Sequence, residues 1–201
     1  MTRSLSSHAE SVRHPLLTRL FHACFALAIL TQLLTSLGME PPRGGRPANA
    51  LFNLHEFSGL VAFGLAFLFW LSILIRRRGT PLGALFPWFS ARRRAAFMAD
   101  LIAHVRAGRQ LRLPPHVDGA AFPAAIHGLG LLLMSFMAVS GTTFFLMVQS
   151  GVSWSYARPV IELHALFGNL AWVYLIGHAG MALVHHVTNS QPITAMWSLR
   201  S

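Results

Sequence analysis

Four long apolar runs, separated by polar stretches, dominate the hydrophobic pattern of the chain. They cover about residues 17–37, 54–75, 122–148 and 160–186. A helix needs roughly 20 apolar residues to cross the hydrocarbon core of a bilayer, and each run meets that length. The pattern therefore predicts that residues 1–201 form a single domain, an all-α integral membrane protein built as a four-transmembrane-helix bundle.

The polar segment 76–122 differs from the other connections in its length and in its amphipathic pattern. Its apolar residues at helical spacing are Phe97, Met98, Leu101, Ile102 and Val105, flanked by arginines. This pattern predicts an interfacial helix between spans 2 and 3 that lies on the membrane surface, with Trp88 and Phe89 as anchors. A helix packed against a partner subunit is the alternative interpretation.

The arginines predict the orientation of the bundle. Nine of them lie in segment 76–122, whereas segment 38–53 contains two and segment 149–159 contains one. Positive charge accumulates on the cytoplasmic side of membrane proteins, so both termini are expected in the cytoplasm. The first apolar run is longer than the apolar region of a signal peptide and is expected to remain in the mature protein.

Composition excludes several other classes of protein. The chain is 54% hydrophobic and only 11% charged, whereas soluble domains carry about 25% charged residues. Its net charge of +10 comes from arginines that lie between apolar runs, which argues against a nucleic-acid-binding face. The single cysteine, Cys24, excludes an internal disulfide, and the absence of a C-x-x-C-H motif excludes covalent attachment of a c-type haem.

Histidines within the apolar runs are the candidate functional residues, because ionisable side chains are costly inside a bilayer. His164 and His178 lie 14 residues apart in the last run, so they share one helix face about 21 Å apart in height. His22 lies near the cytoplasmic end of the first run, and His55 lies near the external end of the second. Depth therefore pairs His22 with His178 and His55 with His164.

Two imidazoles at each of two levels favour haem over other metal centres. Imidazole is a common axial ligand of haem iron, whereas zinc or copper sites need three or four converging ligands. Gly59 and Gly168 each follow an external histidine by four residues, and Gly177 and Gly180 flank His178. These glycines offer room for a flat porphyrin. The alternatives are ordinary small-residue packing for the glycines and hydrogen bonding within the bundle for the histidines.

Four sequence elements carry a resemblance to a known family. They are Arg19-Leu20-Phe21-His22, Leu54-His55-Glu56-Phe57-Ser58-Gly59, His127 with Gly141, and the last-run histidines spaced by 14 and then 7, which close with His185-His186. The chain resembles the bacterial cytochrome b561 family, including the cytochrome b subunits of Ni/Fe-hydrogenases and formate dehydrogenases. It departs from the family pattern at Ala23, where a tryptophan is expected, and at Ala165, where a glutamate is expected.

The resemblance implies two b haems in a protein of the bacterial inner membrane, with His22, His55, His164 and His178 as axial ligands. It implies electron transfer between the quinone pool and a redox partner. The alternative is a stand-alone superoxide oxidase that reduces quinone, in which external arginines attract the anion; these are Arg43, Arg46 and Arg158. A haem-free transporter or assembly protein is the remote alternative.

Histidines near the cytoplasmic surface predict where a quinone binds. His127 in the third run and His185 in the fourth lie there, next to His186. Histidine suits a quinone head group and its protons because its pKa is close to neutrality. The alternative is that these side chains are simply solvated at the helix ends.

Overall fold

The computed structural model describes residues 16–76, 79–112 and 119–188, and it is helical over most of them. The elements are α1 (Leu16–Ser36), α2 (Ala50–Ile75), α3 (Leu82–Leu85), the 3-10 helix η1 (Pro87–Phe89), α4 (Ala91–Arg109), α5 (Ala121–Gln149) and α6 (Trp154–Val187). Helices α1, α2, α5 and α6 are long and apolar enough to cross a membrane. The predicted all-α membrane protein with four spans is therefore confirmed.

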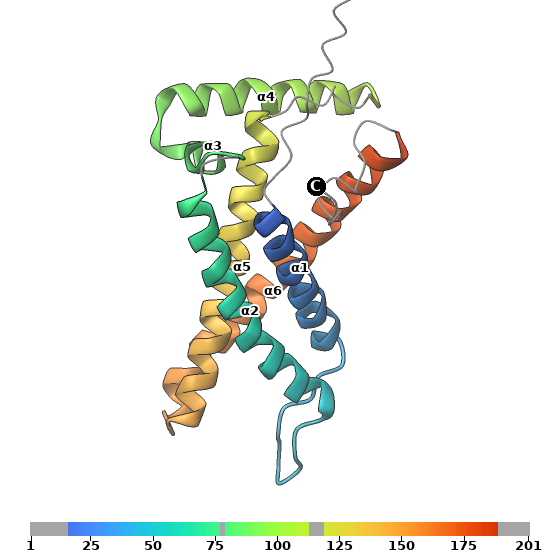
Figure 1. The fold of residues 1–201 in the computed structure, drawn as a ribbon. Coiled ribbons are helices and arrows are strands. Elements are labelled where there is room, and N and C mark those ends of the chain that lie inside the picture. The colour runs from blue at the N-terminus through green and yellow to red at the C-terminus, as the bar shows by residue number, and fades with distance from the viewer. Residues whose placement is uncertain (1–15, 77–78, 113–118, 189–201) are drawn as a thin grey trace, which may run out of the picture.

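The four long helices pack mainly with their neighbours in sequence. Helix α1 packs along α2, α2 along α5, and α5 along α6, whereas α6 approaches α1 at only a few positions. The C-terminal end of α6 leads away from α5 (Figure 1). Buried apolar residues between the helices include Phe25, Leu33, Ala66, Leu131, Met134 and Ala171. Large apolar side chains also cover the outside, as expected of helices whose solvent is lipid.

Two spans begin earlier than the hydrophobic pattern predicts. Helix α2 begins at Ala50 because the side chain of Asn49 accepts a hydrogen bond from the backbone N–H of Phe52 at 2.9 Å. Helix α6 begins at Trp154 and includes Pro159 within its first turns. A polar cap and a short polar turn do not register as hydrophobic, so the apolar runs alone place both starts too late.

Helix α4 lies across the end of the bundle where α2 ends and α5 begins (Figure 1). The carboxylate of Asp100 accepts a hydrogen bond from the backbone N–H of Phe122 at 2.8 Å. The ring of Phe122 lies 5.9 Å from that of Phe97 and 5.0 Å from that of His104, measured between centroids. The predicted helix is thus present and is held to the start of α5. Its position on a membrane surface stays a prediction.

The predicted aromatic anchors have different surroundings. The ring of Trp88 lies 5.3 Å from that of Phe97, whereas Phe89 is 90% exposed. Met98 and Ile102 on α4 are also exposed. Trp88 therefore packs η1 against α4, whereas the side chain of Phe89 is exposed.

Small residues fix the antiparallel register of α5 and α6. The ring of Tyr174 fills the space beside Gly130, and the ring of His164 lies against Gly141. The terminal methyl group of Met137 lies beside Gly168. Because these contacts run in opposite directions along the two helices, residues of α5 reach the same levels as the histidines of α6.

Candidate functional site

The pair of histidines predicted to be external, called the external pair below, comes from α2 and α6. The rings of His55 and His164 face one another with their centroids 6.4 Å apart and their planes at 90°. Both side chains are half-buried. The structure thus brings together two histidines that are more than 100 positions apart in the sequence.

The second pair comes from α1 and α6. The ring centroids of His22 and His178 are 6.5 Å apart, and their planes make an angle of 56°. Tyr174, one turn before His178, stacks on its ring at 5.4 Å and 9°. His127 on α5 presents its ring edge-on at 5.2 Å and 79°. These two neighbours fix the direction in which the imidazole of His178 points.

The ring separations fit one metal ion between the two members of each pair. A metal–nitrogen bond of about 2.0–2.1 Å, plus roughly 1.1 Å from nitrogen to ring centroid, places two opposed imidazoles about 6.3 Å apart. The observed separations are 6.4 and 6.5 Å. At Gly177 and Gly180, which flank His178, an added β-carbon would meet no other described part of the chain within 4 Å. The ring separations therefore fit a metal-centred group between the two imidazoles of each pair, whereas a β-carbon at Gly59 would meet Gln32 and one at Gly168 would meet Met137.

Protein ligands alone do not complete a metal site within the described part of the chain. Over residues 16–76, 79–112 and 119–188, there is no group of three or more histidine, cysteine or acidic side chains that would hold a metal ion. Two imidazoles supply only two ligands, so a metal ion held by either pair would need further ligands of the kind that a cofactor supplies. A porphyrin supplies four in one plane, which leaves the two axial positions for histidine.

A comparison with protein families gives the family of the chain. The family model described as prokaryotic cytochrome b561 matches residues 13–199. The chain belongs to the prokaryotic cytochrome b561 family. No curated protein and no solved structure matched the chain. The protein is therefore a membrane b-type cytochrome that binds haem b and transfers electrons, and the four spans make it a multi-pass protein of a bacterial membrane.

Hydrogen bonds orient the external histidines of this cytochrome b561. Nδ1 of His55 lies 3.0 Å from Oγ1 of Thr35 and 3.1 Å from the carbonyl oxygen of Gln32. Nδ1 of His164 lies 2.9 Å from Oγ of Ser140. In both cases Nδ1 is engaged by a neighbouring helix, so Nε2 is the nitrogen that remains for a metal.

The remaining predicted residues lie at or near these levels. His127 is exposed and contacts His178, while His185 and His186 lie in the last turn of α6, the first half-buried and the second exposed. A β-carbon at Gly59 would lie 3.4 Å from the side-chain amide oxygen of Gln32, so this glycine serves helix packing. His8, His14 and His116, to which the sequence gives no role, lie outside the described residues.

The superoxide alternative depends on three arginines that are predicted to be external, and their surroundings differ. Nε of Arg158 lies 2.7 Å from Oε1 of Glu162, one turn further along α6. Arg43 and Arg46 pair with each other through backbone hydrogen bonds and form an exposed turn. Arg158 and Glu162 thus form an exposed ion pair.

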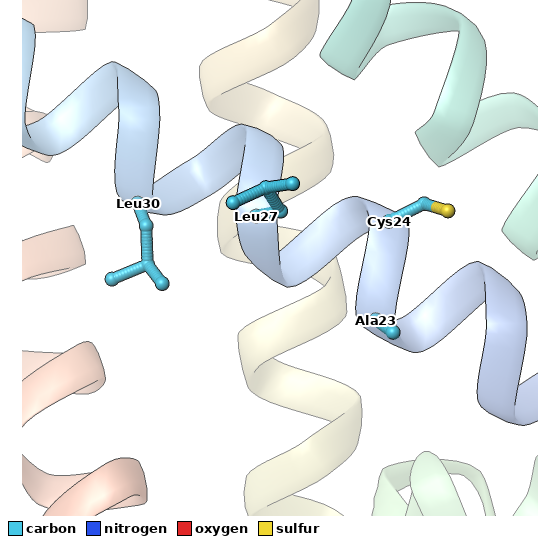
Figure 2. A pocket seen from close by; sticks show the side chains of 4 residues that line it. All are labelled: Ala23, Cys24, Leu27 and Leu30. Carbon is cyan, nitrogen blue, oxygen red and sulfur yellow. The ribbon is translucent and has the colours of Figure 1, made fainter. Parts of the chain in front are cut away.

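An apolar depression on α1 lies away from the histidine pairs. Figure 2 shows its lining side chains, which are Ala23, Cys24, Leu27 and Leu30. These positions lie about 80° to 200° around the helix from His22, so the depression is not part of the haem site.

Four residues of the site were not predicted from the sequence: Gln32, Thr35, Ser140 and Tyr174. Each lies inside an apolar run, where a hydroxyl or an amide looks like an ordinary helix residue. Their contacts with the histidines depend on how neighbouring helices are rotated and placed against one another. A polar residue at the depth of a membrane histidine is the signal that would have identified Thr35 and Ser140.

Proposed function

We propose that this cytochrome carries two b haems and passes electrons between the quinone pool and a redox partner. His22 and His178 hold one haem, and His55 and His164 hold the other. The observation that supports this most strongly is the presence of two imidazole pairs, with ring separations of 6.5 and 6.4 Å. Both separations fit axial ligation of one iron.

The residues of the chain have separate tasks in this proposal. When bound, haem supplies reversible one-electron chemistry at iron. The histidines bind and orient it, and α6 contributes one ligand at each level. Leu131, Met134 and Ala171 lie between the two levels and are at most 6% exposed. This apolar layer excludes water, so electrons cross it more easily than protons do.

The quinone is proposed to bind at the level of His22 and His178, which the arginine distribution predicts to be cytoplasmic. Quinone reduction consumes protons, so its site should border water. His127 is exposed and its ring lies 5.2 Å from that of His178. His185 continues the face of His178 two turns further along α6. These two side chains would hold the head group and exchange protons with it.

The stoichiometry of haem tests the proposal directly. The protein is purified in detergent, and haem is measured as its pyridine haemochrome against protein determined by amino-acid analysis. We expect two haems per chain and a six-coordinate low-spin spectrum, because each iron has two imidazole ligands. One haem per chain, or none, would overturn the two-haem proposal.

The same preparation distinguishes the carrier from a superoxide oxidase. Reduced protein is mixed with ubiquinone, and oxidised protein is separately exposed to superoxide. A carrier is oxidised by quinone, whereas superoxide reduces its haems no faster than it reduces a control cytochrome. Rapid reduction by superoxide coupled to quinone reduction would establish the oxidase instead.

A further inference from the structure

We propose that Thr35 and Ser140 are positioning residues for the external haem, and that they lower its reduction potential by accepting hydrogen bonds from its two histidines. This inference rests on the proposed function, because it requires that His55 and His164 ligate iron. Neither hydroxyl touches the cofactor in this proposal. Each acts through the imidazole that it holds.

The two hydroxyls occupy equivalent places in the two helical hairpins. Thr35 on α1 contacts His55 on α2, and Ser140 on α5 contacts His164 on α6, with distances to Nδ1 of 3.0 and 2.9 Å. Thr35 is 4% exposed and Ser140 is 7% exposed. A buried hydroxyl inside a membrane is costly unless it is hydrogen-bonded. Both hydroxyls meet this requirement at a histidine.

The direction of the hydrogen bonds follows from the other partners of the hydroxyls. Thr35 donates its hydrogen to the carbonyl oxygen of Thr31 at 2.7 Å, and Ser140 donates to that of Met137 at 3.2 Å. A hydroxyl has one hydrogen, so each oxygen is left to accept one from Nδ1–H. The two imidazoles are thus held as the tautomer whose Nε2 carries the free lone pair.

Gln32 strengthens this arrangement at His55. The backbone carbonyl oxygen of Gln32, which can only accept a hydrogen bond, lies 3.1 Å from Nδ1 of His55. Its side-chain amide donates to the backbone carbonyl of His55 at 2.6 Å and to Oγ of Ser58 at 2.6 Å. Because a carbonyl is an acceptor only, Nδ1 of His55 must carry the hydrogen. The backbone and the ring of His55 are both fixed by α1.

The hydrogen bonds have an electronic consequence. An imidazole that donates Nδ1–H to an oxygen becomes more basic at Nε2 and a stronger electron donor to the metal. A stronger donor favours oxidised over reduced iron, and hydrogen bonding around the ligands is one of the ways in which a protein sets haem potential. Removal of the hydroxyls should therefore raise the potential of the external haem.

The test measures both haem potentials in the purified full-length protein. The variants are Thr35→Val, Ser140→Ala and their combination, and the measurement is an optical redox titration with electron paramagnetic resonance of the oxidised haems. At a fixed potential we expect the reduced-to-oxidised ratio of the external haem to rise about two- to fivefold, because only the part of the hydrogen-bond energy that differs between oxidised and reduced iron changes the potential. Its resonance position should shift, and the other haem should be unchanged.

Matched variants separate positioning from general packing. Ser135 accepts a hydrogen bond from the indole N–H of Trp70 at 2.8 Å, which is the same kind of contact between helices without a histidine. Ser135→Ala should leave both potentials unchanged. Thr35→Ser, which keeps the hydroxyl, should restore the wild-type potential if Thr35→Val shifts it or loses the external haem.

The outcomes distinguish this inference from the function on which it rests. Two haems with unshifted potentials in the double variant would overturn the roles of Thr35 and Ser140 while leaving the di-haem proposal intact. A shift that Ser135→Ala reproduces, or that Thr35→Ser fails to reverse, would also overturn them. A wild-type protein with only one haem would overturn the proposed function itself.

Discussion

The imidazole of His164 lies directly against the backbone of Gly141. A β-carbon at Gly141 would come within 3.0 Å of Cε1 of His164 and 3.4 Å of its Nδ1. Nδ1 is also bound to Ser140, so the ring has little freedom to move aside. The position of one proposed haem ligand thus depends on the absence of a side chain on the neighbouring helix.

Gly141→Ala should therefore damage the external haem site. The added methyl group forces the ring of His164 out of its place, and crowding of a packed interior costs about 1–3 kcal/mol. We expect a reduced content or a shifted spectrum of one haem, measured in reduced-minus-oxidised difference spectra at low temperature. Gly64→Ala is the control, because a β-carbon there has no neighbour within 4 Å in the described part of the chain. Equal spectra in the two variants would contradict the prediction.

Single histidine variants should separate the two haems. His22→Ala or His178→Ala should remove one spectral component, whereas His55→Ala or His164→Ala should remove the other, because the two pairs lie at different levels. Haem content should fall from two to about one per chain in each variant, since loss of an axial ligand leaves the iron with a single imidazole. Loss of the same component in His22→Ala and His55→Ala would disprove the pairing.

Quinone kinetics should depend on His127 and His185. The double variant with phenylalanine at both positions should slow oxidation of the reduced haems by ubiquinone about tenfold or more, because general acid–base groups typically contribute about 10²–10⁴-fold. The reduced spectra should stay intact because phenylalanine keeps the ring packing at His178. His186→Phe is the matched control, on a neighbouring face of the same turn. Stopped-flow rates unchanged in the double variant would move the quinone site to the external level.

Asp100 should stabilise the start of α5. The residue before that helix, Ala120, provides no side-chain cap, and Asp100 on α4 accepts from Phe122 N–H instead. Asp100→Ala should lower stability by about 0.5–2 kcal/mol, as the loss of an ordinary helix cap does. Thermal unfolding followed by circular dichroism measures this effect. Asp100→Asn retains an acceptor oxygen and should therefore lose less stability than Asp100→Ala. An equal loss of stability in the two variants would show that the charge of the carboxylate matters more than its hydrogen bond to the helix start.

The membrane architecture was predictable because long apolar runs form few structures other than membrane-spanning helices. Hydrophobic length alone predicts all four spans, and the arginine-flanked pattern predicts α4; both are confirmed as helices. The ends were less predictable, since Asn49 extends α2 through one side-chain hydrogen bond. Such a cap is a local polar contact within a segment that hydropathy treats as loop.

The sequence predicts the level of each site histidine in the membrane, but not the side chains of neighbouring helices that contact it. Helix rise places His22 and His178 at one level, and the structure brings the same two rings to 6.5 Å; their role as ligands stays a prediction. The partners of His55 were not predictable. They depend on the rotation of α1 against α2, which many apolar contacts determine together and which no short motif encodes.

The placement of one histidine of each pair on α6 has a consequence for biogenesis. Ribosomes synthesise the chain from the N-terminus, and α6 is the last span to leave them. The contact between Thr35 and His55 is available once the first hairpin has inserted, but neither histidine pair exists before the fourth span is in the membrane. In the proposed di-haem arrangement, cofactor loading therefore requires a chain that includes α6, and a chain truncated before α6 would offer only half of each site.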